Sequence, residues 1–596
     1  MASHVVRCRQ LRIVGTKLRG NGMGRFSRYR FKDRTAHRSV MIWSGRAPRW
    51  SRLCYPLGLS LLLSCAQAEV AAEGLPEALD TAAPIKHLVI IFQENTSFDS
   101  YFGVYPVALN PPGEPAFEAR PGTPSVNGLT ETLLLHNPNA SNPFRIGRLD
   151  SYTCDQNHDY AAEQRARNGG LMSKYVEFGA EGPGQPGQFC HTNENGDFDT
   201  DLGYFDGNTV TALWNYAQQF ALSDNFFATM SGQSTRGAIN LVAGDVFGAV
   251  CRPVSPSPPD ATIVFVDDGG TVPECDGPVV SNTIAAPTNG TSGTLVDDAD
   301  PFWDVCSQER NTVALTGRNV GDLLNEAGIP WGWFQGGFAL SEDGTCSSSH
   351  PRVAYDLAVG IDPATDPERL IDYVPHHNPF QYFPSTANPS HLPPTALDMV
   401  GHSDQANHLY DLSWFWRAAE AGRLPAVSFL KPANYQNGHP GQSDPLDEQV
   451  FIVETLNRLQ RLPQWRDMAV IIAWDDSDGW YDHVMPPIVN TSATPLDFEC
   501  GSESNGPGAR CGYGPRLPLL VVSPYAKENY VSGVLADQTS ILRFIEDNWL
   551  DGERISDTSF DNLAGSLEDL FEFAEPNPRR LFLDPMSGQP LHGRDR

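Results

Sequence analysis

The chain has 596 residues, of which 40% are hydrophobic and 10% aromatic, enough apolar material for a large buried core. Its charge is distributed unevenly. Residues 1–68 carry 14 Lys and Arg against one acidic residue, whereas residues 69–596 carry 28 Lys and Arg against 71 Asp and Glu. We therefore exclude a fibrous or disordered chain, and also a nucleic-acid partner, because so acidic a body repels phosphate backbones.

The N-terminal segment has the pattern of a secretory signal peptide. Arg46, Arg49 and Arg52 precede an apolar stretch, 53–63, which is followed by the small-residue cleavage pattern AQA at 66–68. The stretch is too short to cross a bilayer comfortably, and no later segment reaches about 18 uninterrupted apolar residues. We expect an exported protein, periplasmic or secreted, without a stable membrane span. A signal anchor that stays uncleaved is the alternative.

Eight cysteines follow this segment, an even set that suits disulfides in an oxidising compartment. None has the C-x-x-C spacing of a zinc site, so we interpret them as links between long loops. Cys500 and Cys511 bracket a Gly-rich loop and are the predicted local pair, while the other connectivity stays open. The eight are Cys154, Cys190, Cys251, Cys275, Cys306, Cys346, Cys500 and Cys511.

Four short apolar runs, rich in β-branched residues, have the composition of strands that are buried on both faces of a parallel sheet. Two further segments, 447–461 and 539–550, place their apolar residues on one stripe of a helix. Strands and helices that alternate in this way predict an α/β fold. The predicted strands are 85–92, 426–430, 468–474 and 517–523.

Long segments rich in Gly, Pro, Ser, Asn and Asp are predicted to be loops, pinned by disulfides, that surround a site. These loops are 110–127, 179–201, 252–300 and 486–515. The expected division of the chain is an N-terminal extension with signal peptide, 1–68, a linker, 69–83, a single catalytic domain, 84–575, and a polar tail, 576–596.

Acidic and amide side chains follow two of the predicted strands. Glu94 and Asn95 come just after the first strand, and Asp475 and Asp476 directly after the third. Ligands of open α/β sheets bind beyond the carboxyl ends of the strands, and these side chains offer the hard oxygen donors that Mg²⁺, Mn²⁺ or Ca²⁺ requires. Carboxylates also join Zn²⁺ or Fe sites. Either cluster alone would indicate a turn or a helix cap, but the two together predict a divalent-metal site.

Ser234 is the candidate nucleophile, because it precedes an apolar stretch, 238–243, that has the composition of a helix. The free backbone N–H groups and the dipole of a first helical turn would favour an alkoxide and an attacked anion. Taken alone, Ser234 would be read as an ordinary N-cap. Histidines in polar surroundings are candidates for acid catalysis or anion contact, although His483 is expected only to orient a carboxylate loop. They are His158, His376, His377, His439 and His483.

Five motifs occur in a fixed order along the chain. They are QENTSFDSYFG (93–103), DNFFATMSGQS (224–234), HHNPFQYF (376–383), AWDDSDGWYDHVMPP (473–487) and LPLLVVSPYAKENYV (517–531). Together they resemble the bacterial phosphoesterase family of phospholipases C and acid phosphatases, within the alkaline phosphatase superfamily. The resemblance covers about residues 84–550. It implies a three-layer α/β/α sandwich with a mostly parallel central sheet, alkaline phosphatase-like.

The resemblance also implies roles for individual residues, with Ser234 as the nucleophile. The positions that match the metal ligands are Glu94, Asn95, Asp475 and Asp476. The histidines that match phosphate-contacting or leaving-group groups are His158, His377 and His439.

The chain departs from the family pattern in three places. Thr96 replaces a usual Arg, and the sequence STRG at 234–237 replaces a proline-rich one. These two departures leave the substrate preference open and keep Thr235 and Ser231 as reserve nucleophiles. The third departure, Gln538 in place of a frequent His, would remove a contact that some relatives use.

The resemblance implies a phosphoric-ester hydrolase that depends on a divalent metal ion and acts through a phosphoseryl intermediate. Phospholipases C of the family commonly carry a further C-terminal region, whereas this chain stops soon after the 539–550 helix. This favours a phosphomonoesterase of acid phosphatase type, with a small phosphate ester as its substrate. Phospholipase C activity on phospholipid head groups is the alternative, and a noncatalytic binding module on the same fold is a third reading.

Overall fold

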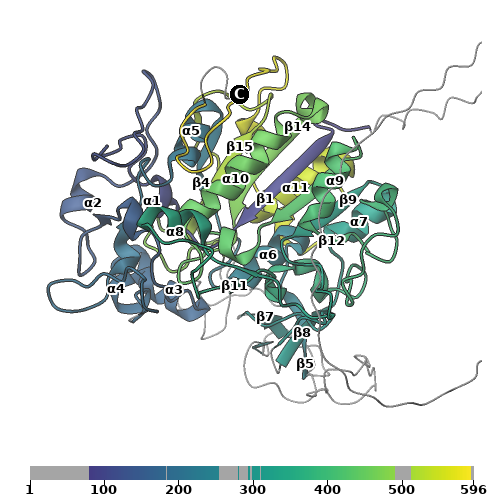
Figure 1. Ribbon diagram of the computed structural model, residues 1–596, viewed down its shortest axis with the longest axis horizontal. Coiled ribbons are helices and arrows are strands. Elements are labelled where there is room, and N and C mark those ends of the chain that lie inside the picture. The colour runs from purple at the N-terminus through teal and green to yellow at the C-terminus, as the bar shows by residue number, and fades with distance from the viewer. Residues whose placement is uncertain are drawn as a thin grey trace, which may run out of the picture. The chain divides into compact units, whose positions relative to one another are not determined.

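A nine-stranded sheet forms the centre of the unit that comprises residues 77–596 (Figure 1). The computed structural model describes residues 80–182, 184–253, 279–280, 293–295, 298–308, 311–489 and 512–591. The sheet order is β12 (Leu409–Asp411), β9 (Trp331–Gln335), β13 (Val427–Lys431), β1 (His87–Gln93), β14 (Met468–Trp474), β15 (Arg516–Val522), β4 (Ala221–Phe227) and β16 (Tyr530–Ser532), with β17 (Ala536–Asp537) also paired to β4.

The sheet is mostly parallel, as predicted. From β12 to β14 every neighbouring pair runs in parallel. The exception is β15, which matches the predicted strand 517–523 but runs antiparallel to both β14 and β4. Because two reversals cancel, β4 again points in the direction of β1, and its carboxyl end lies at the same edge of the sheet.

Helices cover both faces of the sheet (Figure 1), which confirms the α/β/α architecture. The two central strands, β1 and β14, are buried along almost their whole length. The predicted helix 447–461 begins at residue 445, because the Asp444 side chain accepts hydrogen bonds from two backbone N–H groups and Pro445 suits the first turn. The main helices are α5 (Thr211–Gln219), α6 (Ser234–Ala243), α7 (Val320–Ala327), α9 (Leu412–Glu420), α10 (Pro445–Leu459) and α11 (Gln538–Trp549).

Smaller elements lie beyond the main sheet. A second sheet has the order β6 (Val279–Val280), β7 (Gly293–Leu295), β5 (Phe247–Pro253) and β8 (Asn311–Leu315). Two short pairs are β2 (Phe144–Arg145) with β3 (Gly203–Tyr204) and β10 (Ser349–His350) with β11 (Leu370–Ile371). The short helices are α1 (Phe98–Phe102), α2 (Glu131–Leu135), α3 (Tyr160–Ala166), α4 (Tyr175–Phe178) and α8 (Val353–Val359).

Disulfides link Cys154 to Cys190 and Cys306 to Cys346, so the prediction of disulfide-linked loops is confirmed for these two pairs. The predicted pair Cys500 and Cys511 lies outside the described residues. Among the described helices, none combines the length and the apolar character that a bilayer crossing requires.

The C-terminal segment, expected to be a polar tail, is held against α10 as far as it is described. Leu583 is fully buried, and the Asn457 side chain donates a hydrogen bond of 2.7 Å to its carbonyl oxygen. Gln460 makes the same kind of contact, 2.8 Å long, with the carbonyl of Leu581.

Candidate active site

The two acidic clusters meet because the strands that carry them are neighbours. β1 and β14 pair in parallel with Gln93 opposite Trp474, so the residues that follow each strand leave the sheet side by side. The backbone N–H of Asn95 donates to Oδ1 of Asp475 over 3.0 Å. Asn95 adopts a φ of +43°, a left-handed conformation that asparagine tolerates better than most residues.

Ser234 is the first residue of α6, which confirms the predicted helix and the place of the serine in its first turn. The helix packs directly on the carboxyl end of β14. A Cβ atom added to Gly237 would lie 2.1 Å from the carbonyl oxygen of Asp475, so this close approach requires glycine. The side chain of Ser234 is consequently enclosed, and the residue is only 1% exposed.

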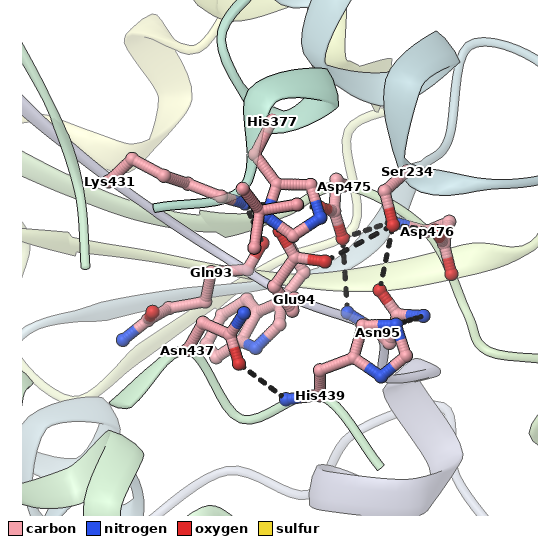
Figure 2. A network of polar contacts seen from close by, with 12 residues as sticks. Gln93, Glu94, Asn95, Ser234, His377, Lys431, Asn437, His439, Asp475 and Asp476 are labelled. Atoms are coloured by element: carbon pink, nitrogen blue, oxygen red, sulfur yellow. Dashed lines mark hydrogen bonds and ion pairs between the residues drawn. The ribbon is translucent and has the colours of Figure 1, made fainter. Parts of the chain in front are cut away.

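The hydroxyl of Ser234 faces three oxygen atoms from the two clusters (Figure 2). Its Oγ atom lies 3.1 Å from Oε2 of Glu94, 3.1 Å from Oδ1 of Asn95 and 3.0 Å from Oδ2 of Asp476. One hydroxyl proton cannot satisfy three acceptors. Burial raises the pKa of Glu94 and of Asp476 well above the usual range, and the charge of Asp475 adds to both shifts. This buried set of hard oxygen donors fits a divalent cation.

The fourth predicted ligand, Asp475, is engaged differently. Its Oδ1 atom accepts from the backbone N–H groups of Asn95 and Asp476, and its Oδ2 atom lies 3.1 Å from Nζ of Lys431. Lys431 also pairs with Oε1 of Glu94. Lys431 is not among the site residues predicted from the sequence, although one signal was present: a charged residue directly follows the apolar run 426–430.

Three of the predicted histidines border this set. Nδ1 of His377 lies 3.1 Å from Oε1 of Glu94, while Nε2 of His439 and of His158 lie 3.2 and 3.5 Å from Nδ2 of Asn95. Burial lowers the pKa of His377 and of His439, which favours their neutral forms. Burial acts in the same direction on His158, but the carboxylates of Asp476 and Asp155 outweigh it and raise its pKa to about 9.

The other two histidines lie among other carboxylates. His376 is 3.5 Å from Asp300. Nδ1 of His483 is 2.6 Å from Oδ2 of Asp99, and the same Asp99 carboxylate also pairs with the buried Arg516. His483, Asp99 and Arg516 thus form a separate group that is held together by ion pairs.

One of the departures from the family pattern, Gln538, has a structural role. Gln538 donates to the carbonyl oxygens of Trp474 and Asp475 over 3.1 and 2.5 Å, so it steadies the end of β14. Of the reserve nucleophiles, Ser231 accepts from the guanidinium of Arg167. The backbone N–H of Thr235 donates to Asp298.

Comparison with known proteins matches residues 85–550 to the Phosphoesterase family. The chain belongs to this family. The matched segment runs from just before β1 to the residue after α11, so it contains Ser234 and every side chain that surrounds it.

Several bacterial relatives of this family member are similar over most of its length. Non-hemolytic phospholipase C of Pseudomonas aeruginosa is 23% identical over 86% of this chain and 62% of its own. Phospholipase C B of Mycobacterium tuberculosis is 23% identical over 84% of this chain and 80% of its own. Phospholipase C A of that organism is 32% identical over a shorter stretch, 26% of this chain and 31% of its own. The chain thus spans less than two thirds of the Pseudomonas protein.

Proposed function

We propose that this family member hydrolyses phosphoric esters, with Ser234 as the nucleophile and a phospholipid as the substrate. The observation that carries the proposal is the position of the Ser234 Oγ atom, 3.0 to 3.1 Å from oxygens of Glu94, Asn95 and Asp476. A buried hydroxyl among oxygen donors at the carboxyl edge of a parallel sheet suits nucleophilic attack on a phosphoryl group.

The choice of phospholipid rests on the relatives. The expectation of an acid phosphatase type rested on the short segment that follows the 539–550 helix. However, phospholipase C B of Mycobacterium tuberculosis aligns over 80% of its own length. Chain length therefore does not separate the two activities. The names of the relatives favour the phospholipase C alternative over the phosphomonoesterase.

In the proposed mechanism, Glu94, Asn95 and Asp476 would hold a divalent cation, with Asp475 beside them. When bound, the cation would supply positive charge that stabilises the attacking oxygen and the charge on the phosphoryl group. The hydroxyl proton of Ser234 has Oδ2 of Asp476 as an acceptor at 3.0 Å. The positive end of α6 lies at Ser234 and favours the negative charge that develops there.

In the first step the bond from Ser234 Oγ to phosphorus forms, and the bond from phosphorus to the leaving oxygen breaks. His158 lies on the side of Asn95, and its raised pKa keeps it protonated, so it is the candidate to protonate that oxygen. His439 lies on the same side in its neutral form. With a phospholipid, diacylglycerol leaves and the head-group phosphate stays on the serine. Water then attacks phosphorus and transfers its proton to the same histidine, while the bond from phosphorus to Ser234 breaks and Ser234 takes its proton back from Asp476. The phosphorylated head group is released.

Product analysis tests this proposal. The purified protein is incubated with phosphatidylcholine vesicles and, separately, with p-nitrophenyl phosphate, and the Ser234→Ala variant serves as the blank. The proposal predicts diacylglycerol and phosphocholine from the vesicles. Release of inorganic phosphate alone would support the phosphomonoesterase, and no turnover together with no binding of any divalent metal would support a noncatalytic module.

We also propose that the catalytic domain spans residues 84–575 and that the protein is exported. The disulfides Cys154–Cys190 and Cys306–Cys346 support export, because such bonds persist in oxidising compartments.

A further inference from the structure

Lys431 is a fully buried cation within the candidate site. It is the last residue of β13, the strand that pairs with β1 on the side opposite β14, and its side chain is 0% exposed. Its ammonium group pairs with Oε1 of Glu94, lies 3.1 Å from Oδ2 of Asp475 and lies 3.5 Å from the carbonyl oxygen of Gln93 (Figure 2). All three ammonium protons therefore have oxygen acceptors.

The contacts with Lys431 give the carboxylates of Glu94 and Asp475 different roles in the site. Glu94 presents Oε1 to Lys431 and Oε2 to Ser234. Asp475 presents Oδ2 to Lys431, while its Oδ1 atom is occupied by two backbone N–H groups. Only one oxygen of Glu94 is thus directed to the Ser234 side, and Asp475 is fixed by protein donors on both oxygens.

Metal centres that carry out phosphoryl transfer with two ions place the ions roughly 3.5–4 Å apart. In this site the position between Glu94 and Asp475 is filled by a protein ammonium. The lysine side chain is covalently attached and so cannot leave the site as a metal ion can. Burial acts to lower its pKa, but the charges of Asp475 and Glu94 outweigh burial and raise that pKa. Removing this charge would leave buried carboxylates without compensation. Three carboxylates contact Lys431 or Ser234, namely Glu94, Asp475 and Asp476. One lysine and one divalent cation balance them.

We propose that Lys431 occupies the place of a second divalent cation and thereby limits the site to a single metal ion. The inference rests on the proposed function, because it assumes that Glu94, Asn95 and Asp476 hold a metal. Lys431 is a positioning residue in this view, since it acts through Glu94 and Asp475. Its ammonium nitrogen also lies over the Phe92 ring, 5.1 Å from the ring centroid.

The test compares metal stoichiometry in the full-length wild type and three variants. Lys431→Met keeps the length of the apolar stem and removes the charge, whereas Lys431→Arg keeps the charge. Lys527→Met is the matched control, because Lys527 pairs with Asp569 over 3.0 Å at a partly exposed position away from the candidate site. Each protein is stripped of metal and titrated with Mn²⁺, which is followed by calorimetry and by electron paramagnetic resonance.

The proposal predicts one bound Mn²⁺ with an uncoupled spectrum in the wild type, in Lys431→Arg and in Lys527→Met. Lys431→Met should take up two equivalents, with the spectrum of two coupled ions. Two coupled ions in the wild type would overturn the inference and leave the proposed function standing, and so would a folded Lys431→Met protein that still binds one. If Lys431→Met does not fold, the stoichiometries of the wild type and of Lys431→Arg test the proposal, and two bound ions in either protein would overturn it. A wild type that binds no divalent metal would overturn the proposed function as well.

Discussion

The Oγ atom of Ser234 lies 3.0 Å from Oδ2 of Asp476, although 242 residues separate the two in the chain. The contact depends on the packing of α6 against the carboxyl end of β14, because Ser234 begins the first element and Asp476 follows the second. The proposed chemistry therefore requires both the hydroxyl and the close approach of these two elements.

Replacing Ser234 by Ala should abolish turnover and leave the fold intact, because the change removes one oxygen and creates no clash. We expect kcat to fall by roughly 10³-fold or more, as for other enzymes that lose a nucleophile. Thr235→Ala is the matched control and should retain most of the activity. Near-normal turnover in Ser234→Ala combined with its loss in Thr235→Ala would move the nucleophile to Thr235.

Replacing Gly237 by Ala should separate α6 from β14, because the new Cβ atom would lie 2.1 Å from the carbonyl oxygen of Asp475. A displacement of about 1 Å can lower turnover about 100-fold, and we expect a loss of that order. Gly182→Ala is the control, since nothing lies within 4 Å of the added atom there. Circular dichroism establishes that both variants fold, and equal activity in the two would show that the packing of α6 does not position Ser234.

Glu448 should make the stability of the protein depend on pH. It is buried on α10, where it accepts hydrogen bonds of 2.8 Å from the Tyr101 hydroxyl and the Trp474 indole, and burial raises its pKa to about 8. The folded state then keeps a proton that the unfolded chain loses above about pH 4.3. The free energy of unfolding should therefore fall as pH rises to about 8, by up to about 1.4 kcal/mol per pH unit.

Glu448→Gln removes this titration, so the variant should gain stability relative to the wild type as pH rises from about 5 to about 8. Denaturant unfolding at several pH values measures the difference. The exposed Glu454 on the same helix provides the control, and Glu454→Gln should follow the wild type at every pH. Parallel curves for wild type and Glu448→Gln would contradict the shifted pKa.

The sequence was sufficient for the strands that carry the two acidic clusters, because 88–92 and 468–474 are continuous apolar runs, a composition that predicts buried strands. It could not give the direction of β15, since strand composition does not encode direction. Pro518 lies at the register shift between Leu517 and Leu519, where its missing N–H costs no regular hydrogen bond. β9 was missed because WGWFQ has no β-branched residue.

The convergence of Ser234 with Glu94 and Asp476 was expected from the resemblance and from the sheet. The role of Lys431 was not, because a sequence shows only that a lysine follows a strand. Its partners are set by the order of β13, β1 and β14 in the sheet, a long-range property.

Export predicts a defined mature protein. In the native host the secreted or periplasmic chain should begin near Glu69 and contain Cys154–Cys190 and Cys306–Cys346 as disulfides. Peptide mass spectrometry without reduction measures both features. A cytoplasmic protein whose eight cysteines are free thiols would contradict the prediction.

The stereochemical course at phosphorus tests the central claim, covalent attack by Ser234, most directly. A choline phosphodiester made chiral at phosphorus with sulfur and oxygen isotopes is hydrolysed, and the configuration of the product is determined. Each in-line displacement inverts the phosphorus, so attack by Ser234 followed by attack of water predicts net retention. Net inversion would show a single direct attack by water and would contradict the account.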